Sequence, residues 1–144
     1  MENEMTDMTL AGVAQAKAKS TLSSYKSLFG FLLLVEFIVS IAVLAIPDRI
    51  LNWLGMEHIP GEKWLQLLAG TWIFLLLFQI IARREPLLGR YPNIVNIIGR
   101  VGLAGLLIYV GGDFLYVAAY MLVSALLLYI FFRRMIIGEL QTRP

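Results

Sequence analysis

The chain has 144 residues, of which 59% are hydrophobic and 15% are charged, with a formal net charge of +2. This composition is too apolar for a water-soluble domain of that length and predicts a protein of the lipid bilayer. With no cysteine and one histidine, the chain by itself excludes disulfide frameworks, thiolate metal sites and a bis-histidine haem.

Residues 1–26 are predicted to form a cytoplasmic N-terminal tail. The tail begins with an acidic segment and continues with alanines and scattered lysines. It has no apolar core followed by a cleavage site, so we expect the first membrane span to act as an uncleaved signal. A helix touching the lipid headgroups and a flexible tail both fit this composition.

Four continuously apolar stretches follow, at residues 28–46, 64–82, 94–110 and 114–132. Each is close to the roughly 20 residues with which a helix spans a bilayer, and none alternates as a barrel strand would. Helices also satisfy their own backbone in lipid. We therefore predict an all-α integral membrane protein, with a four-transmembrane-helix bundle over residues 27–134 and a cytoplasmic C-terminal tail at 135–144.

The short connections agree with these helix ends. Proline follows the first and second stretches and precedes the third, at Pro47, Pro86 and Pro92. The loop at 47–63 has an apolar side that includes Trp53, which predicts a short interfacial helix. The Gly111-Gly112-Asp113 turn leaves room only for a tight hairpin, so the third and fourth spans should be antiparallel neighbours.

Lysine and arginine are distributed unequally between the two sides of this arrangement. Nine lie in the tails and the second loop, namely Lys17, Lys19, Lys26, Arg83, Arg84, Arg90, Arg133, Arg134 and Arg143. Two lie in the first loop, Arg49 and Lys63. The positive-inside rule therefore predicts that both termini are cytoplasmic.

Charged and polar residues inside the predicted spans form the candidate site. Glu36 and Arg100 both lie about 12–14 Å below the cytoplasmic face if each residue of a helix rises about 1.5 Å, and an isolated charge at that depth costs at least ~2.5 kcal/mol. Asn96, Ser124, Ser40 and the shallower Gln79 lie near this layer. Two interpretations stay open: a structural salt bridge, or a site in which Glu36 carries a proton or binds a ligand and Arg100 anchors an anion or a quinone head.

Other features have simpler interpretations. Gly99, Gly102 and Gly105, with Ala104 beside them, make the third span a surface that neighbouring helices can approach closely. His58 lacks the partners of a metal site, so no metal is expected. The arginine doublets of the second loop and the C-terminal tail fit topology and anionic lipid, and nothing else favours nucleic-acid binding.

Several short signatures, read together, resemble a known family. Pro47 closes the first span and Trp53-Leu54-Gly55 follows, Ala82-Arg83-Arg84-Glu85-Pro86 closes the second, and Gly99-Arg100 lies in the third. This layout, over Phe29 to Arg134, resembles the small four-helix bacterial membrane proteins called DoxX-like. The resemblance implies a bacterial inner membrane and a link to redox assemblies, since members include the membrane subunit of a thiosulfate:quinone oxidoreductase and proteins that mature other redox enzymes.

The sequence favours a non-catalytic accessory or assembly subunit of a larger membrane complex, bound to other subunits or to copies of itself. The chain offers no recognisable catalytic constellation and no cofactor ligands, so we do not expect catalysis by this chain alone. A quinone-interacting subunit, in which a quinone or lipid meets Glu36, Asn96, Arg100 and Ser124, is the alternative. A small transporter ranks last, because inverted repeats and broken helices are not evident.

Overall fold

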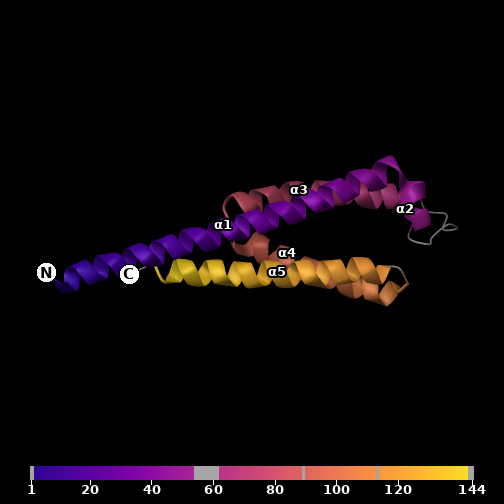
Figure 1. The fold of residues 1–144 in the computed structure, drawn as a ribbon. Coiled ribbons are helices and arrows are strands. Elements are labelled where there is room, and N and C mark those ends of the chain that lie inside the picture. The colour runs from indigo at the N-terminus through magenta and orange to yellow at the C-terminus, as the bar shows by residue number, and fades with distance from the viewer. Residues whose placement is uncertain (1, 54–61, 89, 113, 143–144) are drawn as a thin grey trace.

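The computed structural model describes residues 2–53, 62–88, 90–112 and 114–142, and in these ranges the protein is entirely helical (Figure 1). The helices are α1 (Glu2–Ala45), α2 (Pro47–Trp53), α3 (Glu62–Arg84), α4 (Arg90–Val110) and α5 (Phe114–Leu140). Four of them, all but α2, are long and apolar enough to cross a membrane. The predicted four-helix membrane fold is therefore confirmed, and the chain is a multi-pass membrane protein.

Helix α1 joins the predicted tail and the first span without a break. Its N-terminal part is rich in alanine, the best helix former, and proline is absent until Pro47. Because a proline disfavours helical geometry in the residue before it, α1 ends at Ala45. The tail is therefore helical from Glu2 onward, and its contact with lipid headgroups stays a prediction.

The predicted short helix between the first two spans is present as α2. Pro47 stands at its first position, where a missing N–H costs nothing, and Asp48 lies in its first turn. The later part of the predicted segment, including His58, lies outside the described residues. Whether α2 lies on the membrane surface stays a prediction.

The last two spans form the expected antiparallel hairpin. Gly111 and Gly112 join them with φ angles of 74° and 61°, which side chains other than glycine rarely adopt. Helix α5 continues past the predicted end of its span, so the segment predicted as a C-terminal tail is helical as far as Leu140. Helix α4 begins at Arg90, and Pro92 is tolerated there because it lies in the first turn.

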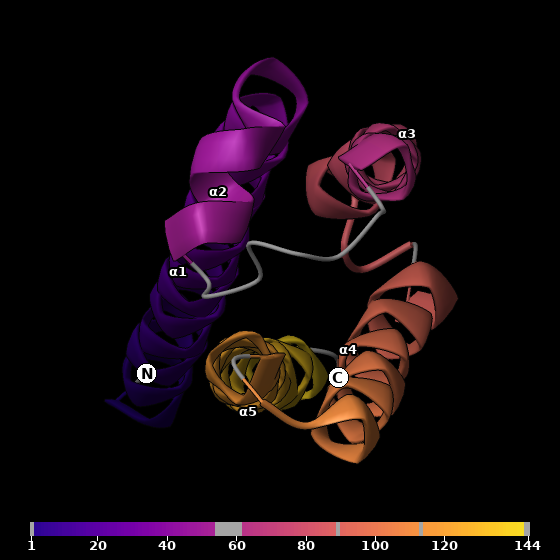
Figure 2. The same cartoon turned by 90° about the vertical axis from the view of Figure 1, so that its right-hand side faces the viewer.

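The four long helices stand at the corners of the bundle (Figure 2). Helix α4 packs chiefly on α5, and α1 packs on both α3 and α5. Helices α1 and α4 lie at opposite corners and do not pack directly on each other. Both chain ends lie at one end of the bundle, here called the terminal end (Figure 1).

The core is densest toward the terminal end. Tyr25 and Phe29 of α1 meet Phe132 and Met135 of α5 there, and both Phe29 and Phe132 lie 5.7 Å from the Tyr25 ring, measured between centroids. Large apolar side chains such as Phe78 also cover the outer surface of the spans. An apolar exterior around a small packed interior is the pattern expected of helices surrounded by lipid.

Candidate functional site

Glu36 of α1 and Arg100 of α4 form a buried ion pair in the middle of the bundle. Arg100 Nη1 contacts Glu36 Oε1, and the side chains are 1% (Arg100) and 4% (Glu36) exposed. The Glu36–Arg100 pair, which the similar depth of the two residues in the membrane made feasible, is therefore present in the structure. Because α1 and α4 stand at opposite corners, the pair crosses the bundle centre and connects two helices whose backbones do not pack on each other.

Two further predicted residues join the pair. Arg100 donates from Nη1 to Ser124 Oγ at 3.0 Å and from Nε to Asn96 Oδ1 at 3.3 Å. Ser40 is buried at the same layer, but its hydroxyl donates to the backbone carbonyl of Glu36 at 2.8 Å. Ser40 therefore closes a bond within its own helix and does not contact the charged groups.

Tyr120 is a member of the cluster that sequence reasoning missed. Its hydroxyl donates to Glu36 Oε1 at 3.3 Å. The signal was present in the spacing, because Tyr120 precedes Ser124 by four residues on α5, as Asn96 precedes Arg100 on α4. Residues four apart share one face of a helix. The two pairs thus face each other across the contact between α4 and α5.

Four buried side-chain atoms among the described residues have no hydrogen-bond partner. They are Glu36 Oε2, Arg100 Nη2, Asn96 Nδ2 and Gln79 Oε1. Buried polar groups in proteins are nearly always hydrogen-bonded, and an exception calls for a functional group, a water or a ligand to explain it. The polar layer therefore has two unused donor groups, Arg100 Nη2 and Asn96 Nδ2, and two unused acceptor oxygens.

A second polar cluster lies nearer the terminal end and was not anticipated. Tyr25 donates to Asn93 Oδ1 at 2.7 Å, and Asn93 Nδ2 donates at 3.4 Å to the backbone carbonyls of Ala82 and Pro86. Asn93 is completely buried. It satisfies carbonyls at the end of α3 and in the turn that follows, so this cluster joins α1, α3 and α4.

Two arginines predicted as topology signals also make specific contacts. Arg83 donates from Nε to the Lys26 carbonyl at 2.9 Å and lies over Gly30, where an added Cβ would come within 2.6 Å of its guanidinium. Arg90 forms an ion pair of 3.0 Å with Glu139 near the end of α5. These contacts fasten α3 to α1 and α4 to α5 at the terminal end.

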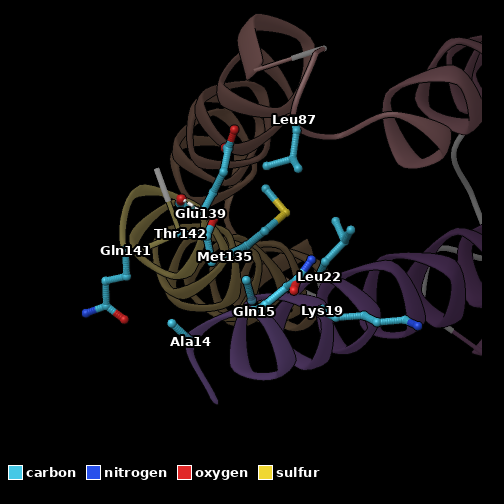
Figure 3. A pocket seen from close by; sticks show the side chains of 10 residues that line it. Ala14, Gln15, Lys19, Leu22, Leu87, Met135, Glu139, Gln141 and Thr142 are labelled. Carbon is cyan, nitrogen blue, oxygen red and sulfur yellow. Dashed lines mark hydrogen bonds between the residues drawn. The ribbon is translucent and has the colours of Figure 1, made fainter. Parts of the chain in front are cut away.

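The extensions of α1 and α5 enclose a groove at the terminal end (Figure 3). Its volume is about 760 Å³, and Leu22, Leu87 and Met135 converge on it. Lys19 lines the same groove but extends away from these three side chains. Gly138 lets the two extensions approach closely, since a Cβ there would lie 3.3 Å from the Cα of Ala18.

The glycines of the third span face away from the bundle. Gly99, Gly102 and Gly105 are exposed, and a Cβ added to any of them would meet nothing within 4 Å. Ala104, on the opposite side of α4, is fully buried against α5. Of the small residues that the sequence indicated as a packing surface, Ala104 packs within the bundle, whereas the three glycines meet no helix of the described part of this chain.

The described residues contain no group of three or more histidine, cysteine, aspartate or glutamate side chains suited to a metal ion. Comparisons with family models, curated proteins and solved structures found no match to this chain. The resemblance to DoxX-like proteins stays a prediction. The site is therefore interpreted from its own geometry.

Proposed function

We propose that this protein is a non-catalytic accessory or assembly subunit of a larger membrane complex, with a respiratory or redox complex as the expected assembly. The observation that carries the proposal is the outward position of Gly99, Gly102 and Gly105 on α4. This surface is called the glycine face below.

Small residues matter in membranes because lipid chains are as apolar as leucine. Transmembrane helices therefore associate through close packing, and glycine lets two backbones approach. A glycine in a helix interior also costs about 0.5–1 kcal/mol relative to alanine. Three such glycines on an outer face fit the docking of a transmembrane helix from another subunit.

The polar cluster is consistent with a subunit that performs no chemistry of its own. Glu36 and Arg100 neutralise each other, and they connect two diagonal helices. A bundle with a small-residue surface exposed on its outside fits an accessory subunit that packs against another helix. The proposal therefore places the contact with the partner on α4 and a structural role at the bundle centre.

The test is gentle extraction of the tagged full chain from its own membrane, followed by native mass spectrometry. We expect recovery in a fixed ratio with larger membrane subunits. Gly102→Leu should reduce that recovery about fivefold or more, because a leucine on the docking surface costs on the order of 1–3 kcal/mol in overpacking. Gly70→Leu on α3 is the matched control, since a Cβ there also meets nothing within 4 Å.

The outcomes separate cleanly. Partner loss in Gly102→Leu with retention in Gly70→Leu supports the glycine face. Equal retention in both variants contradicts the placement of the contact on α4, and consistent isolation of the unaltered chain as a lone monomer contradicts the accessory function.

A quinone-interacting membrane subunit is the second candidate. The unpartnered donors Arg100 Nη2 and Asn96 Nδ2 favour it, because quinone carbonyls accept hydrogen bonds. This candidate predicts that Arg100→Lys, which keeps the charge and removes the guanidinium donors, abolishes quinone-dependent activity while the protein still accumulates in the membrane. Loss of the protein itself would indicate the structural pair instead.

A further inference from the structure

The centre of the bundle contains a matched donor and acceptor that the chain leaves unused. Glu36 and Arg100 are both almost completely buried, yet Glu36 Oε2 and Arg100 Nη2 have no partner. An unsatisfied buried polar group destabilises the folded protein, and a charged one destabilises it more. The same two side chains already contact each other through Oε1 and Nη1. The unpartnered atoms are therefore the second carboxylate oxygen and the second terminal nitrogen of one ion pair.

The other two unpartnered atoms extend this polar surface toward the terminal end. Asn96 lies one turn from Arg100 on α4. On α3, contacts of Arg83 with the Lys26 carbonyl and of Gln66 with the Leu44 carbonyl set the antiparallel register with α1. That register places Gln79 opposite residues 30–31 of α1, about one and a half turns closer to the terminal end than Glu36. The unused donor of Asn96 and acceptor of Gln79 therefore lie at similar depth.

The helices that carry Asn96 and Gln79 are the least tightly joined neighbours in the bundle. Helices α3 and α4 pack on each other less than α1 packs on α3 or α4 packs on α5. The boundary between α3 and α4 is therefore the side on which a molecule dissolved in the bilayer would meet least resistance on its way to the polar layer.

The pattern of unused atoms restricts the chemistry of a ligand. A hydroxyl oxygen accepts a hydrogen bond and also donates one, so a single hydroxyl satisfies both Arg100 Nη2 and Glu36 Oε2. An ether or ketone oxygen satisfies only the arginine, and a cation or anion would add net charge to a pair that is already neutral. We propose that Glu36 and Arg100 bind the hydroxyl of a neutral membrane-soluble molecule that enters between α3 and α4.

This inference is independent of the partner subunit. It shares the polar cluster with the second candidate function but requires no redox chemistry. Binding of a hydroxyl ligand that has no redox activity would agree with this inference and would contradict a quinone role. Loss of the partner in Gly102→Leu tests the accessory function alone.

The experiment uses the full chain in lipid nanodiscs and two probes, 4-nonylphenol and its methyl ether. The probes share the ring and the alkyl chain, and both oxygens accept a hydrogen bond, but only the phenol donates one. We expect native mass spectrometry titrations to give at least about tenfold tighter binding of the phenol, as one hydrogen bond to a buried charged acceptor implies.

Two variants test whether Glu36 is the group that distinguishes the phenol from its methyl ether. Glu36→Gln replaces the carboxylate beside Arg100 by an amide. The ratio of the binding affinities of the phenol and the ether should then be close to one. Tyr120→Phe removes only a bond to the other carboxylate oxygen, so it should leave the ratio near that of the unaltered protein. If Glu36→Gln fails to fold, the comparison of the two probes on the unaltered chain still decides.

Equal binding of phenol and ether, or binding of neither, overturns the proposal. Water-edited solid-state NMR identifies the alternative occupant. Strong polarisation transfer from water to the Arg100 side chain, undiminished when 4-nonylphenol is added, would show that water fills the position and would also overturn the proposal. Transfer that falls as the phenol binds supports it.

Discussion

Replacing Arg100 by methionine removes the cation from a carboxylate that the bundle encloses. Arg100 donates to Glu36, Ser124 and Asn96, whereas Glu36 Oε1 would keep only the bond from Tyr120. Breaking one side of a buried ion pair costs about 3–5 kcal/mol, because the remaining charge stays without compensation. We therefore expect Arg100→Met to destabilise the protein by about that amount.

The double variant Glu36→Leu with Arg100→Met should behave differently. Replacing both members of a buried pair by apolar groups is often neutral or stabilising. The double variant should then lie within about 1–2 kcal/mol of the unaltered protein, and the coupling energy between the two positions should reach about 3 kcal/mol or more. Ser124→Ala is the local control, with an expected cost of about 1 kcal/mol for one hydrogen bond.

The assay is reversible unfolding of the purified chain in mixed micelles of increasing dodecyl sulfate fraction, followed by tryptophan fluorescence. The reasoning would be refuted if Arg100→Met cost less than about 1 kcal/mol, or if the double variant were as unstable as the sum of the two single variants. Either result would mean that the charges are hydrated or paired elsewhere.

Three further predictions use the same unfolding assay. Tyr25→Phe should cost about 1 kcal/mol, since it removes the buried bond to Asn93; a change under 0.3 kcal/mol would contradict a role for that cluster. Gly138→Leu should cost about 1–3 kcal/mol and separate the extensions of α1 and α5, because a Cβ would approach the Cα of Ala18 at 3.3 Å; cross-linking of the two extensions should decrease. Gly112→Val should cost about 1–2 kcal/mol, since φ there is 61°; stability equal to that of the unaltered chain would refute the need for glycine at this position.

Much of the fold could be read from patterns that act locally. Continuous apolar stretches of sufficient length require transmembrane helices, because lipid offers no partner for backbone groups. Proline at position 47 and the glycine pair at 111–112 end helices through their own backbone geometry. The number of residues between each charge and the cytoplasmic end of its span also placed Glu36 and Arg100 in one layer, since a helix rises by a constant amount per residue.

Other features depend on which helix faces lie together. Tyr120 joined the cluster because α5 presents it beside Ser124, and Asn93 was buried because α3 ends next to it. The outward direction of the glycine face follows from α4 turning Arg100 and Ala104 inward. A single sequence shows periodicity but does not say which neighbour each face meets.

The sequence by itself determined that the chain lies in a membrane, that it crosses four times and that two opposite charges share one depth. These properties arise from hydropathy, length and helical rise, which are local quantities. Only the tertiary structure decided that α1 and α4 are diagonal, that Glu36 and Arg100 cross the centre, and that four buried polar side-chain atoms of the described residues have no partner. Those properties depend on how whole helices rotate and pack against one another. Hydropathy does not reveal this in a membrane, because lipid-facing and core-facing residues are nearly equally apolar.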